Sequence, residues 1–135
     1  MDILLLLIII ALVWVIIASV TDLKKREVPD WISYSLIIIG IILNIINAIV
    51  ENNFFLLINP LIWFVVFFII ANLMYYSSQW GGGDAKLLMG FGIVFSIYPK
   101  SLSGIFNPYF GSIPFPIIFL LNIIIFGSIY GIFWT

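Results

Sequence analysis

Acidic side chains are the groups through which this sequence could carry out catalysis. The chain contains no histidine and no cysteine, which excludes serine–histidine triads, imidazole bases, thiol nucleophiles and metal sites built from either residue. Two aspartates have unusual neighbours: Asp22 ends a long apolar stretch, and Asp84 directly follows three consecutive glycines. Two carboxylates held close together in a low-dielectric site share a proton, so the ionised acid can activate water while the neutral acid protonates the leaving amine. The residue types therefore favour an aspartic peptidase without a metal or cofactor.

The composition is that of a membrane protein. Hydrophobic residues make up 64% of the chain and charged residues 8%, against about 25% charged in soluble globular proteins. Apolar stretches recur over residues 3–20, 31–50, 54–76, 85–98 and 113–133. They predict an all-α helix bundle with about five transmembrane helices, forming a single domain over residues 1–135. A cleavable signal peptide at the start is disfavoured, because the chain opens without a basic segment and the apolar run is long.

Charge in the first loop sets the predicted topology. Three of the five basic residues lie together there, at Lys24, Lys25 and Arg26, which places this loop in the cytoplasm beside anionic lipid and the N-terminus outside. Two further crossings then bring residues 81–86 to the cytoplasmic face. Asp22 and Asp84 are thus expected at the same membrane level. No basic stretch occurs beyond this loop and the net charge is −1, so no nucleic-acid partner is predicted.

The three glycines, Gly81, Gly82 and Gly83, precede an unusually short apolar stretch. Fourteen residues at 85–98 give a helix of about 21 Å, against a hydrocarbon core of roughly 30 Å. Either the bilayer thins locally, or the helix begins below the headgroups and the glycines form irregular backbone beside a wet pocket. We expect the glycines to permit close approach of a substrate strand or helix, and Gly82 to reject a β-branched residue. The simpler alternative is a polar turn in which Asp84 caps the following helix.

Several polar residues have expected supporting roles. Pro29 ends the first loop, and Asp30 is placed to cap a helix that starts at Trp31. Lys86 is two residues from Asp84, so it does not face that carboxylate on a helix, and we expect it to extend to the lipid headgroups. Within the apolar stretches, asparagines are expected to make hydrogen bonds between helices, at Asn44, Asn47, Asn72 and Asn122.

Two segments resemble motifs of known peptidases. The sequence Gly-Gly-Gly-Asp-Ala-Lys at 81–86 is similar to the GxGD motif of intramembrane aspartic peptidases. The sequence Asp-Leu-Lys-Lys-Arg-Glu-Val-Pro-Asp-Trp at 22–31 resembles the first-aspartate loop of the type IV prepilin peptidase family. The archaeal preflagellin and prepilin peptidases are the most similar members, because the cysteine-rich segment of many bacterial enzymes is absent.

This resemblance implies that Asp22 and Asp84 are the catalytic pair of a multi-pass endopeptidase in the cytoplasmic membrane. It implies substrates with a basic cytoplasmic leader followed by an apolar helix, cut between the two before assembly into a surface filament. The family usually has six spans, and archaeal relatives commonly carry a cytoplasmic segment before the last one. Five spans are found here, so a naturally short member, a fragment or a truncated chain is expected.

Two alternative functions belong to other classes. A non-catalytic membrane protein could use an acid pair to bind or conduct cations or protons. A presenilin-like intramembrane protease would share only the glycine–aspartate motif, and the basic loop with Val28 and Pro29 separates this chain from that group.

Overall fold

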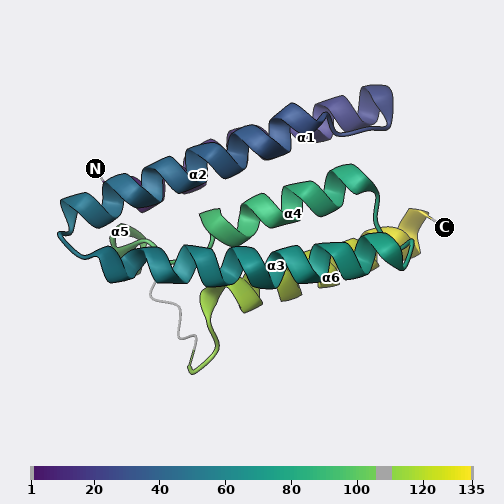
Figure 1. The fold of residues 1–135 in the computed structure, drawn as a ribbon. Coiled ribbons are helices and arrows are strands. Elements are labelled where there is room, and N and C mark those ends of the chain that lie inside the picture. Colours follow the sequence, from purple (N-terminus) through teal and green to yellow (C-terminus); the bar gives the residue numbers. More distant parts are fainter. Residues whose placement is uncertain (1, 106–110, 135) are drawn as a thin grey trace.

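The computed structural model describes residues 2–105 and 111–134, and these form helices joined by turns (Figure 1). The long helices are α1 (Ile3–Lys25), α2 (Asp30–Val50), α3 (Ile58–Tyr76) and α6 (Phe115–Trp134). A short 3-10 helix, η1 (Phe54–Leu57), leads into α3, and α4 (Gly82–Val94) and α5 (Lys100–Ser103) connect α3 to α6. Four helical segments in this part of the chain are long and apolar enough to cross a membrane: α1, α2, η1 with α3, and α6. The predicted class, an all-α polytopic membrane protein, is confirmed.

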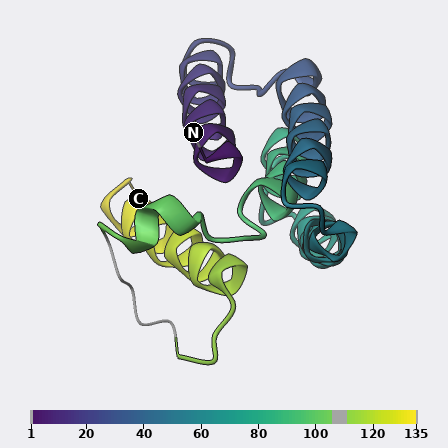
Figure 2. The same cartoon turned by 90° about the vertical axis from the view of Figure 1, so that its left-hand side faces the viewer.

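The predicted fourth span appears as α4, the central helix of the bundle. It has 13 residues, about 20 Å of helix, and it is not among the four membrane-capable segments. Figures 1 and 2 show α4 between a layer of α1 and α2 and a layer of α3 and α6. Its side chains from Leu88 to Val94 are mostly buried, which is the environment of a helix that is apolar on all sides. Because α4 is covered by protein, its length need not match the bilayer.

Close packing of α4 depends on a missing side chain at Gly92. A Cβ atom there would lie 2.6 Å from the backbone oxygen of Trp63 and 3.0 Å from the Cβ of Phe67. Small residues at such positions let two helix backbones approach each other in membrane proteins. This contact fixes α4 against α3.

The helix α6 is attached mainly through aromatic rings in its first half. Phe119 stacks on Phe95 with ring centroids 4.0 Å apart and contacts Phe91 edge to face at 5.5 Å. From Ile124 to Trp134, nearly every side chain is exposed. The second half of α6 therefore leaves an apolar space beside α4.

The expectation for the asparagines is confirmed only in part. The Asn44 side-chain amide donates to the backbone oxygen of Gly40 at 2.8 Å and reaches the oxygen of Ile93 on α4 at 3.5 Å. For Asn72 and Asn122 the prediction is wrong, because each amide donates to the carbonyl four residues earlier in its own helix. An amide in an apolar helix can satisfy its donor locally without a partner helix.

Candidate active site

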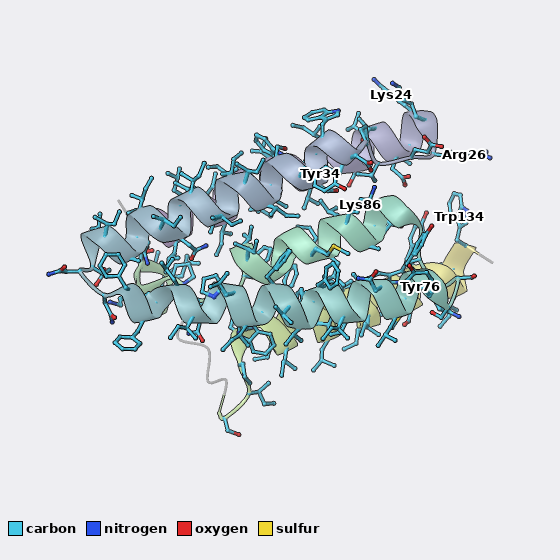
Figure 3. All side chains as sticks on the ribbon, viewed as in Figure 1. Lys24, Arg26, Tyr34, Tyr76, Lys86 and Trp134 are labelled. Carbon is cyan, nitrogen blue, oxygen red and sulfur yellow. The ribbon has the colours of Figure 1, made fainter. Side chains whose placement is uncertain are left out.

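Asp22 lies in the last turn of α1, at the end of the bundle where α4 begins. The helix ends because Arg26 adopts a left-handed conformation, with φ of 55°, and its N–H donates to the Asp22 backbone oxygen at 2.7 Å. Figure 3 shows Lys24 and Arg26 at this end of the molecule, together with Lys86 of α4. The loop then turns back, and Pro29 is the N-cap residue of α2.

Asp84 is the third residue of α4, where its carboxylate faces the start of the helix. Gly81 is the N-cap residue, with extended backbone angles, and no side chain caps the helix from that position. The Asp84 carboxylate accepts a hydrogen bond from the Gly81 N–H, which is how an acid at this position satisfies a free donor of the first turn. The alternative in which Asp84 is itself the N-cap is therefore wrong.

The three glycines differ in what surrounds them. Gly82 and Gly83 are helical, so irregular backbone is the wrong description for both. A Cβ on Gly82 would find only Tyr75 at 3.5 Å, an ordinary contact, whereas one on Gly83 would lie 2.8 Å from the Cβ of Val28. Within the protein, the close approach is made by Gly83 and not by Gly82, because the loop before α2 packs directly on Gly83. The approach of a substrate to the three glycines stays a prediction.

Both aspartates line one cavity of about 390 Å³. Its wall combines the end of α1 and the following loop with the start of α4, and the lining residues are Asp22, Arg26, Glu27, Val28, Asp30, Gly81, Gly82, Gly83, Asp84 and Lys86. The structure thus brings together the predicted aspartates, the three glycines and Lys86. Pro29 is outside this lining and acts at the start of α2. No group of three or more acids in the described part of the chain could hold a metal ion.

The surroundings of Asp84 raise the pKa of its carboxyl above the usual value. Partial burial in the cavity wall is the main cause, although the side chain remains open to solvent; the negative charge of Asp22 adds to it, and the hydrogen bond from Gly81 opposes both. Asp84 precedes the predicted span at 85–98 and lies outside the four membrane-capable helices. A raised pKa at one acid beside a second acid is the condition under which a pair shares a proton.

The Asp22→Asn variant should lower the pKa of Asp84 without returning it to the usual value. Removing the Asp22 charge makes ionisation of Asp84 easier, while burial, the larger cause, remains. Titration of the labelled Asp84 carboxyl carbon by NMR measures this pKa in detergent, with Asp2→Asn as the control. An unchanged pKa in Asp22→Asn would show that the two carboxyls do not interact.

Comparison with known proteins identifies the family of the chain. A sequence model described as the type IV leader peptidase family matches residues 9–132, a range that includes both aspartates. The chain belongs to this family. No solved structure matches it.

The curated relatives that this chain matches are longer than the chain itself. A preflagellin peptidase of Methanocaldococcus jannaschii is 32% identical over 123 residues, covering 88% of this chain and 52% of the relative. One of Methanococcus maripaludis is 38% identical over 92 residues, 68% of this chain and 38% of the relative. Prepilin peptidase EppA of Methanothermobacter thermautotrophicus is 29% identical over 120 residues, 86% of this chain and 31% of the relative. The chain spans about half the length of these relatives or less.

A second, apolar cavity of about 550 Å³ also reaches Asp84. It lies among the end of α3, α4 and the second half of α6, and its lining residues are Met74, Gln79, Trp80, Asp84, Leu87, Leu88, Phe91, Ile123, Ile124, Gly127 and Ser128. This cavity was not predicted from the sequence, since it depends on how α6 diverges from α4. Asp84 therefore borders a polar space on one side and an apolar space on the other.

The role expected for Asp30 is corrected by the structure, in which Asp30 contacts Lys86. The helix α2 begins at Asp30 itself, and no side chain caps it. The Lys86 Nζ atom donates to the Asp30 carboxylate at 2.7 Å, a contact that was not predicted, and its extension to the headgroups stays a prediction. This pair was not predicted, because the two residues belong to different helices. The pair could have been predicted from the opposite charges of Asp30 and Lys86, because each lies near the start of a helix and both starts were predicted on the cytoplasmic face.

Proposed function

We propose that this chain carries the catalytic centre of an aspartic endopeptidase that removes a basic leader from preflagellin-like or prepilin-like precursors at the cytoplasmic face of the cell membrane. The observation that carries the proposal is the shared cavity of Asp22 and Asp84. Membership of the type IV leader peptidase family supports it, as do relatives named preflagellin peptidase.

The proposed reaction uses one proton shared by the two carboxyls. The acid with the raised pKa, Asp84, holds the proton. The ionised Asp22 accepts a proton from a water molecule while the oxygen of that water attacks the scissile carbonyl carbon. Asp84 donates its proton to the carbonyl oxygen, which gives a neutral tetrahedral intermediate. When the carbon–nitrogen bond breaks, the leaving nitrogen takes the proton held by Asp22, and the hydroxyl proton returns to Asp84.

The two cavities that meet at Asp84 suit a substrate of mixed character. Apart from the Asp30–Lys86 ion pair, the polar cavity is bordered by Glu27 and Arg26 in addition to the catalytic pair. Its acidic groups therefore outnumber its basic ones, which favours positively charged residues on that side. The larger cavity is lined mostly by apolar side chains such as Leu87, Phe91 and Ile123. A chain with a basic segment before the cut and an apolar segment after it would place the scissile bond beside Asp84.

Cysteine labelling tests the membrane orientation that the proposal requires. Because the chain has no cysteine, each introduced thiol is unique. Lys25→Cys and Gly82→Cys should resist an impermeant thiol reagent in intact cells, because positive-inside bias places both in the cytoplasm. Ser103→Cys is the external control. In the same helix, α5, the Ser101 N–H donates to the Asp2 carboxylate at 3.1 Å, so α5 lies at the same end of the bundle as the N-terminus, which is predicted to be outside. Labelling of position 25 or 82 from outside would contradict the orientation.

Cleavage of a defined precursor tests the activity itself. The purified chain in lipid vesicles is incubated with a precursor that has a lysine-containing leader before an apolar helix, and the products are weighed by mass spectrometry. We expect two fragments from a single cut at the leader boundary. The Methanocaldococcus jannaschii preflagellin peptidase, assayed in parallel, controls for substrate quality. If that relative cleaves and this chain leaves the precursor intact, the proposed activity is wrong for this chain.

A further inference from the structure

One ion pair joins the first residue of α2 to the second turn of α4 beside the shared cavity. The Lys86 Nζ atom lies 2.7 Å from the Asp30 carboxylate and 5.7 Å from the centre of the Tyr34 ring. Figure 3 shows Tyr34 of α2 and Lys86 of α4 pointing toward one another. Tyr34 is four residues after Asp30, so both groups lie on one face of α2 and hold the ammonium between them.

A second contact ties the same two regions together from the other side of Asp84. Val28 packs on Gly83 so closely that a Cβ there would lie 3.1 Å from the Val28 backbone oxygen and 3.3 Å from its nitrogen. Gly83 precedes Asp84 by one residue, and Lys86 follows it by two. The loop after α1 and the start of α2 are therefore held against α4 at points on both sides of Asp84.

We propose that Asp30, Lys86 and Tyr34 form a positioning clamp, which holds Asp84 at its working separation from Asp22. The clamp acts on Asp84 through the backbone, and its residues take no part in the proton transfers. Its role in the reaction rests on the proposed function, whereas its effect on the distance between the two helix ends does not.

The exposure of the ion pair indicates that it contributes to the position of Asp84 more than to the stability of the fold. The Lys86 side chain is 34% exposed and that of Asp30 is 59% exposed, and exposed ion pairs contribute little to global stability. Catalytic geometry is far more sensitive, since a misplacement of about 1 Å can lower a rate about 100-fold. Loss of the clamp should therefore lower kcat and leave KM and the unfolding temperature nearly unchanged.

Charge exchange is the decisive set of variants. Asp30→Asn and Lys86→Met each remove the pair, and we expect kcat to fall about 10- to 100-fold in each. The double variant Asp30→Lys with Lys86→Asp restores opposite charges and should recover most of the lost kcat. Glu51→Gln is the matched control, because it removes the Lys100–Glu51 pair, at 3.5 Å, outside the cavity. Singles with wild-type kcat, or a double variant no better than the singles, would overturn the clamp.

A distance measurement tests the clamp without relying on activity. Spin labels at Leu23→Cys, where the side chain is 84% exposed, and at Gly81→Cys report the separation of the two helix ends. We expect a narrow distance distribution, broadened by Lys86→Met and narrow again after charge exchange. Unchanged distributions would overturn the clamp even if kcat falls. Wild-type protein that cleaves no precursor would count against the proposed function, and the spin-label distances would still decide on the clamp.

Discussion

Asp22→Asn and Asp84→Asn are each expected to slow precursor cleavage about 100- to 10,000-fold while the protein still folds. The reaction needs one ionised and one protonated carboxyl, and an amide can neither accept the proton of water nor donate one to the substrate. Loss of a general acid or base costs about 100- to 10,000-fold in rate. Folding should survive, because asparagine keeps the size of aspartate and neither side chain is part of the buried core.

Asp2→Asn is the matched control for these variants. Asp2 caps α1 at the opposite end of that helix, where its carboxylate accepts a hydrogen bond from the Leu4 N–H at 3.0 Å. Asparagine caps helices about as well as aspartate does. Initial cleavage rates measured by mass spectrometry, with circular dichroism to verify the helix content, should therefore place Asp2→Asn with the wild type. Full cleavage by Asp84→Asn would end the aspartic peptidase assignment.

Gly83→Ala is expected to cause the largest structural disturbance among single methyl additions near the site. The new methyl group would lie 2.8 Å from the Val28 Cβ and 3.1 Å from the Val28 backbone oxygen, and a backbone atom cannot move aside as a flexible side chain can. Overpacking of this kind costs about 1–3 kcal/mol. It also pushes the loop that follows Asp22 away from α4, so the cleavage rate should fall together with stability.

Gly82→Ala makes the same chemical change one residue earlier and provides the comparison. A Cβ at Gly82 meets only a carbon of the Tyr75 ring, at 3.5 Å, and alanine is favoured over glycine in a helix. The unfolding temperature of Gly82→Ala should equal or exceed that of the wild type, and its loss of cleavage should be much smaller than that of Gly83→Ala. Equal behaviour of the two variants would contradict the packing of Val28 on Gly83.

Hydropathy predicted which segments are helices, and charge predicted which ends of those helices lie on the same side of the membrane. The apolar stretches predicted the helices because a membrane-buried backbone must satisfy its own hydrogen bonds. The alternation of crossings placed Asp22 and Asp84 at one end of the bundle, and in the structure they line one cavity. Neither inference required knowing which helices touch.

The features that sequence analysis missed depend on tertiary distances. The close approach lies at Gly83 and not at Gly82, because only the docked loop decides which glycine meets Val28. Asp30 does not cap α2, because the helix begins at Asp30 itself, and its carboxylate pairs with Lys86 instead. The position of Lys86 depends on how α4 packs against α2. The burial of α4 likewise depends on the helices packed around it, and these cannot be predicted from the periodicity of a uniformly apolar segment.

The most direct test of the central claim is the cleavage rate of the double variant Asp22→Asn with Asp84→Asn, measured beside both single variants under single-turnover conditions. Groups that act as one unit give strongly non-additive losses, so we predict that the double variant is no slower than the slower single variant. If the two losses instead multiply, or if either single variant retains the wild-type rate, the two aspartates do not work as a catalytic pair.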